Sequence, residues 1–187
     1  MLRSAILLGF VLVANVAAQD RGSARAADSV EAAVLRAVLR HMHAEPGNYV
    51  FPAPRWPLCS ASTNDANRTA CVPDSLRVEF DGAVADYFER QARRDTLSEG
   101  TLSQLGLERA DSLTGSGSNS CTEPTVYVLS PVGLDVAKTH AVVGAAVFRG
   151  PTPQPSRCGF GLGVSLLLRR AATGEWVVVA TVNGWRA

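Results

Sequence analysis

The sequence predicts an α+β fold in which N-terminal helices pack on one face of a C-terminal antiparallel β-meander of about four strands. Apolar residues recur at helical spacing in the first half of the chain. Short β-branched or aliphatic segments, separated by turn residues, occupy residues 125–185. A chain of 187 residues, of which 47% are hydrophobic, is also large enough to bury a core. Together these observations favour one α+β domain over a disordered chain.

The chain begins with the pattern of a secretory signal peptide. Arg3 supplies a positive charge, Ala5–Ala14 is apolar, and Val16–Ala18 offers small residues to a signal peptidase. The apolar run is too short to span a bilayer, which needs about 20 residues. No cysteine follows it, as one would in a lipoprotein. We therefore expect a secreted or periplasmic protein with three parts: signal peptide 1–18, disordered lead-in 19–27 and domain 28–187.

The predicted mature chain carries no net charge. Removing 18 of the 187 residues leaves 169, with 17 basic and 17 acidic side chains. This balance lacks the basic footprint of a nucleic-acid-binding protein and the polybasic patch of a membrane-surface protein. No other stretch approaches the length of a membrane span. The expected partner is an envelope or extracellular protein or a small ligand, rather than nucleic acid or a membrane.

All four cysteines follow the predicted signal peptide: Cys59, Cys71, Cys121 and Cys158. In an exported protein, an even number of cysteines indicates structural disulfides. Pairing of nearest neighbours would give Cys59–Cys71 and Cys121–Cys158, although the sequence does not decide between pairings. The spacing lacks the close pairs of zinc sites and redox motifs, so we expect neither a metal nor another cofactor.

Two amphipathic helices are predicted in the first half of the chain. The first begins at the capping box Asp28–Glu31 and ends near His43, because Pro46–Gly47 interrupts the pattern. The second follows Pro73 and contains Gly82, an unfavourable helix residue. Their apolar positions are Val30, Val34, Leu35, Val38 and Met42, then Leu76, Phe80, Val84, Tyr87 and Phe88.

Strands are predicted mainly after the flexible linker Gly115–Ser120. Before it, Tyr49–Phe51 is predicted as a short strand, and residues 97–113 mix a weak helical period with glycines. The later strand segments are Thr125–Ser130, Ala137–Arg149, Val164–Arg169 and Trp176–Val182. Because turn residues separate consecutive segments, we expect an antiparallel meander.

The C-terminal part of the chain contains a block of short motifs. They are Ser130–Asp135, Lys138–Val143, Cys158–Gly163, Leu166–Arg169, Gly174–Val178 and, close to the end, Trp185. Together with the upstream helix Glu79–Leu97, this block resembles a group of uncharacterised secreted bacterial proteins. The resemblance implies export and architecture but no activity, and the Pro-rich insert Arg149–Pro155 and the first third of the chain depart from it. A weaker likeness to NTF2-like and cystatin-like sheets implies the fold alone.

The histidines offer two candidate chemical sites. His41, His43 and Glu45 are the densest set of metal-ligand types, yet residues two apart on a helix do not share a face. Histidines near a helix C-terminus are also favoured by the helix dipole, so a capping or surface role is expected. His140 could act as a general base, but the sequence identifies no partner, and we expect it to be structural or exposed.

Two further patterns have simple structural explanations. Asp81, Asp86 and Glu89 could perform acid–base chemistry, but they also fit a solvated helix face opposite the apolar stripe. Gly159–Gly163 lacks the spacing of a phosphate-binding loop and precedes a strand, so a close backbone approach or a β-bulge beside Cys158 is expected. The sequence contains no G-x-S-x-G, S-x-x-K or H-E-x-x-H motif.

These observations favour an exported, disulfide-stabilised, non-catalytic binding or structural module, and we assign no catalytic, cofactor-binding or metal-binding residue. The alternative is an NTF2-like small-molecule-binding protein or enzyme with a pocket between helices and sheet. In that case His140 or the face formed by Asp81, Asp86 and Glu89 would have to point inward. A third interpretation is a cystatin-like inhibitor or an adhesion partner, with Pro151–Ser156 as its exposed loop.

Overall fold

A computed structural model describes most of the predicted domain. The described residues are 29–43, 49–52, 58, 72–109, 126–149 and 160–186. Several predictions lie outside them, namely the signal peptide and lead-in, the four cysteines, the Gly115–Ser120 linker and the Pro151–Ser156 loop.

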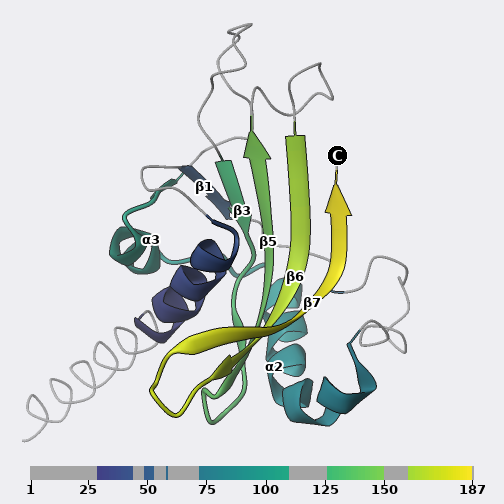
Figure 1. Cartoon of the computed structure of the whole chain (residues 1–187). Coiled ribbons are helices and arrows are strands. Elements are labelled where there is room, and N and C mark those ends of the chain that lie inside the picture. The colour runs from purple at the N-terminus through teal and green to yellow at the C-terminus, as the bar shows by residue number, and fades with distance from the viewer. Residues whose placement is uncertain are drawn as a thin grey trace, which may run out of the picture.

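The described residues form an α+β arrangement of helices and one sheet (Figure 1), which confirms the predicted fold class. The helices are an N-terminal helix over residues 29–41, α2 (Asp74–Arg93) and α3 (Glu99–Leu105). The strands are β1 (Tyr49–Pro52), β2 (Glu108–Arg109), β3 (Val126–Leu129), β4 (Gly133–Leu134), β5 (His140–Arg149), β6 (Phe160–Arg170) and β7 (Trp176–Arg186).

The predicted C-terminal meander is present as β3, β5, β6 and β7, each antiparallel to its neighbour. Two features extend it. The strand β1 pairs in parallel with both β2 and β3, so the sheet is mixed. The short strand β4 pairs with β5 beyond the end of β3.

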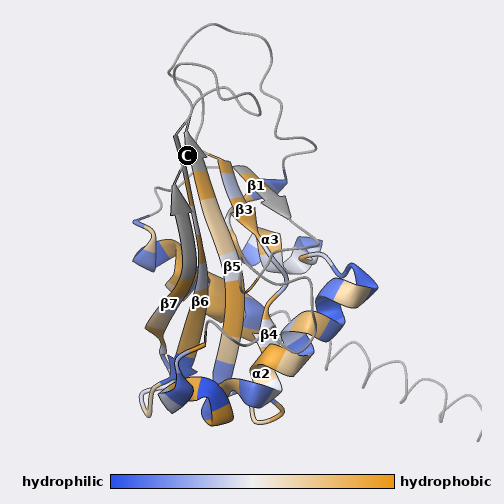
Figure 2. Ribbon diagram, turned by 90° about the vertical axis from the view of Figure 1, so that its right-hand side faces the viewer, coloured by the Kyte–Doolittle hydropathy of each residue, from blue (hydrophilic) through white to orange (hydrophobic). Residues whose placement is uncertain are grey.

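The expectation that the helices pack on one face of the sheet is wrong. Along β5, Ala141, Val143 and Ala145 belong to one buried cluster, whereas Val142 and Ala146 belong to another. Successive side chains of a strand point to opposite faces, so the two clusters lie on opposite sides of the sheet. The N-terminal helix and α3 contribute to the first cluster and α2 to the second (Figure 1). Figure 2 accordingly shows β5 and β6 as mainly hydrophobic, as in a sheet covered on both faces.

Contact between α2 and β4 depends on Gly133. A Cβ atom at this position would lie 2.4 Å from both the carbonyl oxygen of Ala83 and the Cβ of Tyr87. Only a residue without a side chain allows the helix to pack directly on the strand backbone. The neighbouring ring of Tyr87 is fully buried, and this burial raises the pKa of its hydroxyl.

Helix ends account for the segment that the sequence left ambiguous. The helix α2 ends at Arg94, whose φ of 58° is left-handed. Ser98 then caps α3 by accepting a hydrogen bond from the backbone N–H of Thr101 at 3.0 Å, and Gly106, with φ of 65°, ends it. In the parts of the chain that the structure describes, no helix combines the length and apolar composition needed to cross a membrane.

Candidate functional site

An open hollow lies between the N-terminal helix, α2 and the turn that joins β4 to β5. Its volume of about 790 Å³ is in the range of small-molecule pockets. Two cations, Arg90 and Lys138, line it. Its carboxylates are Glu31, Asp86, Glu89, Asp95 and Asp135. The hollow is therefore polar, with more acidic than basic groups in its wall.

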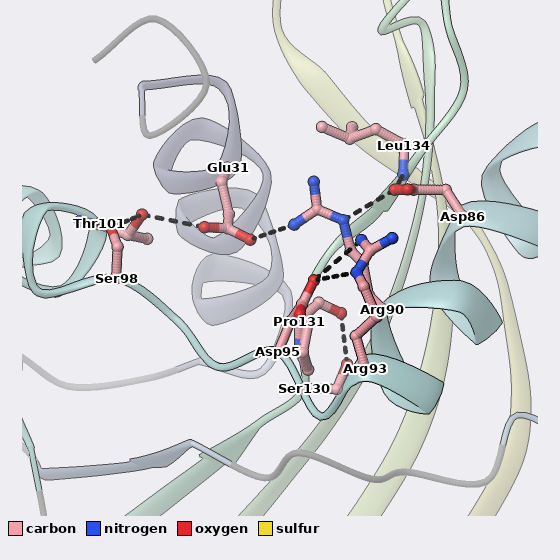
Figure 3. Close-up of polar contacts among 10 residues, drawn as sticks. All are labelled: Glu31, Asp86, Arg90, Arg93, Asp95, Ser98, Thr101, Ser130, Pro131 and Leu134. Atoms are coloured by element: carbon pink, nitrogen blue, oxygen red, sulfur yellow. Dashed lines mark hydrogen bonds and ion pairs between the residues drawn. The ribbon is translucent and has the colours of Figure 1, made fainter. Parts of the chain in front are cut away.

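A chain of polar contacts fixes part of this wall (Figure 3). The guanidinium of Arg90 lies 3.0 Å from Asp86 Oδ2 and 3.6 Å from Glu31 Oε1. Asp86 Oδ2 also accepts a hydrogen bond from the backbone N–H of Leu134 at 2.9 Å, and Glu31 Oε2 accepts one from the Thr101 hydroxyl at 3.1 Å. These contacts connect three helices to β4, so the charged groups are held in place before any ligand arrives.

The structure separates the three acidic residues that the sequence grouped together. Asp86 and Glu89 both line the hollow, because residues three apart share a helix face. Asp86 is only half-exposed, whereas Glu89 is exposed and paired with Arg93. Asp81 is exposed and lies outside the hollow. The expectation of a solvated face therefore describes Asp81 and Glu89 but not Asp86.

His140 is neither isolated nor fully exposed. Its Nε2 lies 2.7 Å from Glu79 Oε1, and its Nδ1 lies 3.1 Å from Asp135 Oδ2 and 3.0 Å from Thr139 Oγ1. The ring also packs edge-to-face against Phe80, with 5.0 Å between ring centroids. The partners that the sequence did not identify thus come from α2 and from the β4–β5 turn.

Both carboxylates at His140 are stabilised in the ionised form. Burial raises the pKa of Asp135, but hydrogen bonds from the backbone and side chains of His140 and Thr139 outweigh it and lower that pKa to about 2. Arg169 donates two hydrogen bonds to Glu79, at 2.5 and 2.6 Å. These bonds are the main reason why the pKa of Glu79 is lowered. Burial raises that pKa by less, and the hydrogen bond with His140 lowers it further.

This arrangement does not form a nucleophile and base pair. Each ring nitrogen of His140 already faces a carboxylate, so neither faces an open position for a substrate. The Thr139 hydroxyl lies at the ring, and Asp135 also binds it, at 2.7 Å. The geometry is that of a structural junction between α2 and the sheet.

The structure does not gather the other histidines into a site. His41 and His43 are both exposed, and His43 adopts a left-handed φ of 52° as the N-terminal helix ends. Glu45 lies outside the described residues. Within the described ranges, no group of three or more His, Cys, Asp or Glu side chains is placed to hold a metal ion.

The glycine run belongs to a strand. Gly161 and Gly163 lie in β6, and the pairing of β6 with β7 shifts register between Gly163 and Ser165. This irregularity lies within β6 and not beside Cys158, so a bulge beside that cysteine stays a prediction. Cys158 and Gly159 lie outside the described residues.

Comparison with known proteins finds no relative: no family model, no curated protein and no solved structure matches the chain. The function must therefore be inferred from the geometry of the hollow and its surroundings.

Proposed function

We propose that the protein is an exported, disulfide-stabilised, non-catalytic module that binds a small ligand with a positively charged group. The proposed binding site is the hollow beside β4. The observation that carries this proposal is the fixed polar wall, in which Glu31, Arg90 and Asp86 are held by mutual contacts. Polar groups that are already oriented lose little conformational entropy on binding, which favours affinity and specificity.

The charge of the hollow supports a cationic ligand. Five carboxylates and two cations line it, so its formal charge is negative. An ammonium or guanidinium group would be attracted by this negative charge and could donate charge-assisted hydrogen bonds to the carboxylates. A ligand of moderate size fits the volume of about 790 Å³.

The surroundings of His140 support binding rather than catalysis. The candidate general base has both ring nitrogens committed to Glu79 and Asp135. A general base needs a ring nitrogen within reach of the proton that it removes. The hollow therefore contains charged groups suited to recognition, without a positioned base and nucleophile among the described residues.

Export and disulfides complete the proposal and rest on the sequence. The signal-peptide pattern and the four cysteines suggest an oxidising compartment. The likeness to uncharacterised secreted bacterial proteins points in the same direction. Leu58 and Val72, the neighbours of Cys59 and Cys71, belong to the same buried cluster, which favours a bridge between these two cysteines.

A ligand panel tests the binding proposal. Amines and guanidines, with neutral and anionic compounds of similar size as controls, would be screened by thermal unfolding and then by calorimetry. We expect cationic compounds alone to stabilise the protein. Glu89→Gln, which changes an exposed residue in the wall, should weaken their binding about fivefold.

Asp81→Asn is the matched control, because it removes a carboxylate from the same helix outside the hollow. Its affinity should equal that of the wild type. The proposal is wrong if neutral or anionic compounds bind as well as cations, if no cation binds, or if the two variants behave alike.

A further inference from the structure

His140 joins two parts of the molecule through one ring. Glu79 lies on α2, whereas Asp135 belongs to the turn between β4 and β5. Arg169 of β6 lies directly opposite His140 in the sheet and donates to Glu79, so a cation also lies beside the ring. Lys138 lies in the same turn with an exposed side chain. The ring is half-buried, so its protonation can respond to the solvent.

The number of protons on the ring decides how many of these contacts can form. An ionised carboxylate only accepts hydrogen bonds. A neutral imidazole has one N–H donor and one acceptor nitrogen, whereas an imidazolium has two donors. The ring can therefore donate to Glu79 and Asp135 at the same time only when both nitrogens carry a proton.

We propose that His140 is a pH-sensitive latch, which ties α2 to the β4–β5 turn when doubly protonated and releases one of them on losing a proton. This inference does not depend on the ligand proposed above.

The contacts of Thr139 indicate which connection is released. Its hydroxyl lies 2.7 Å from Asp135 Oδ2 and 3.0 Å from His140 Nδ1. When Nδ1 loses its proton it becomes an acceptor, and the Thr139 hydroxyl can turn from Asp135 to the ring. Asp135 Oδ2 then loses both of its donors, while Nε2–H still donates to Glu79.

Release would loosen the turn rather than the helix. Asp135 still accepts hydrogen bonds from the backbone N–H groups of Thr139 and His140, at 2.7 and 2.9 Å. These two bonds alone hold the turn less firmly than they do together with the two side-chain contacts. The same turn contributes Asp135, Val136 and Lys138 to the hollow. A rise in pH would therefore also change the part of the wall that these three residues form.

Nuclear magnetic resonance of the ring nitrogens tests the latch directly. His41 and His43 are exposed and serve as references within the same protein. At the acid end of the titration we expect both His140 nitrogens to carry a proton. As the pH is raised, Nδ1 should be the nitrogen that loses its proton. The latch is excluded if His140 has one proton at every pH between 5 and 8.5, or if Nε2 is the site of loss.

Amide hydrogen exchange tests the loosening of the turn. We expect the protection factors of Thr139 and His140, corrected for intrinsic exchange, to fall about tenfold across the titration, the effect of one charge-assisted hydrogen bond. Amides of α2 near Ala83 should not change. Equal protection at both ends of the titration would overturn the proposal.

Variants separate the latch from a general effect of pH. His140→Gln should abolish the pH dependence of exchange in the turn, and Glu79→Gln should move the His140 titration to lower pH because one anion is removed. Asp81→Asn removes an anion from the same helix away from the ring and should do neither. If His140→Gln does not fold, the wild-type titration and Glu79→Gln still decide the question.

Discussion

At Gly133 the backbones of a helix and a strand come into contact. The space that a Cβ would need is already occupied by atoms of Ala83 and Tyr87. Gly82, on the facing helix, is different: a Cβ there would lie 3.5 Å from Asp135 Cβ, an ordinary contact distance. Two glycines close together in space thus have opposite requirements.

Gly133→Ala should therefore destabilise the protein by about 3 kcal/mol, because the helix and strand must separate to admit a methyl group. Gly82→Ala should instead stabilise it by about 0.5–1 kcal/mol, since alanine is the better helix former. Chemical denaturation of both variants measures the two effects. Equal effects of the two substitutions would show that α2 does not approach β4 as described.

Asp135 makes stability depend on acid pH. Its pKa in the folded protein is about 2, below the ordinary value of about 3.9. Since the folded state favours the ionised form, the stabilisation is complete above the ordinary value and is lost as pH falls from about 4 towards 2. Glu79, whose pKa is also lowered, acts in the same direction.

We expect Asp135→Asn to flatten this acid limb when the free energy of unfolding is measured between pH 2 and 6. The wild type should be the more stable protein at pH 6, and the difference should shrink towards pH 2. Asp81→Asn should retain the wild-type slope. Parallel curves for the wild type and Asp135→Asn would contradict the prediction.

At the scale of elements, the strand arrangement favours one pairing of the cysteines. The strands β3 and β6 are both antiparallel to β5, so they start at the same end of the sheet. Cys121 and Cys158 precede these two starts by a few residues. Leu58 and Val72, which adjoin Cys59 and Cys71 in the sequence, belong to one buried cluster.

Peptide mapping of the protein without reduction should therefore give Cys59–Cys71 and Cys121–Cys158. Each bridge should stabilise the fold by about 3 kcal/mol, measured by unfolding with and without reductant. The same map should place the mature N-terminus at Gln19. A free thiol at any of the four positions, or a crossed pairing, would refute the assignment.

Local patterns explain which elements the sequence could predict. The meander was predictable because its strands are neighbours in the chain and turn residues separate them. The two-sided covering of the sheet also left a signal, the unbroken apolar run of β5 from Ala141 to Val147, which is typical of a strand buried on both faces. The parallel pairing of β1 left no signal in the sequence, because Tyr49 and Val126 are neighbours only in the folded chain.

The site was harder to predict for the same reason. His140 could be singled out as a residue type, but Glu79 is 61 positions away and no spacing rule connects them. Asp135 could have been recognised, since an Asp before a turn often accepts hydrogen bonds from the backbone that follows. Asp86 and Glu89 were identified, yet only the packing of helices around β4 shows that they share a hollow.

At the scale of the whole molecule, two consecutive parts of the chain together build a core on both faces of the sheet. Residues 126–186 supply the meander, and residues 29–105 supply the helices that cover it. The hollow lies where these contributions meet, lined by the N-terminal helix, α2 and the β4–β5 turn. The shape of the hollow therefore depends on how the helices pack against the sheet.

The position of β1 has a consequence for the order of folding. Its partner β3 starts at Val126, so a ribosome completes β1 and both early helices long before their place in the sheet exists. Pairings between distant segments form slowly, because a large loop must close first. The apolar surface of the N-terminal segments is therefore synthesised before the strands that bury it.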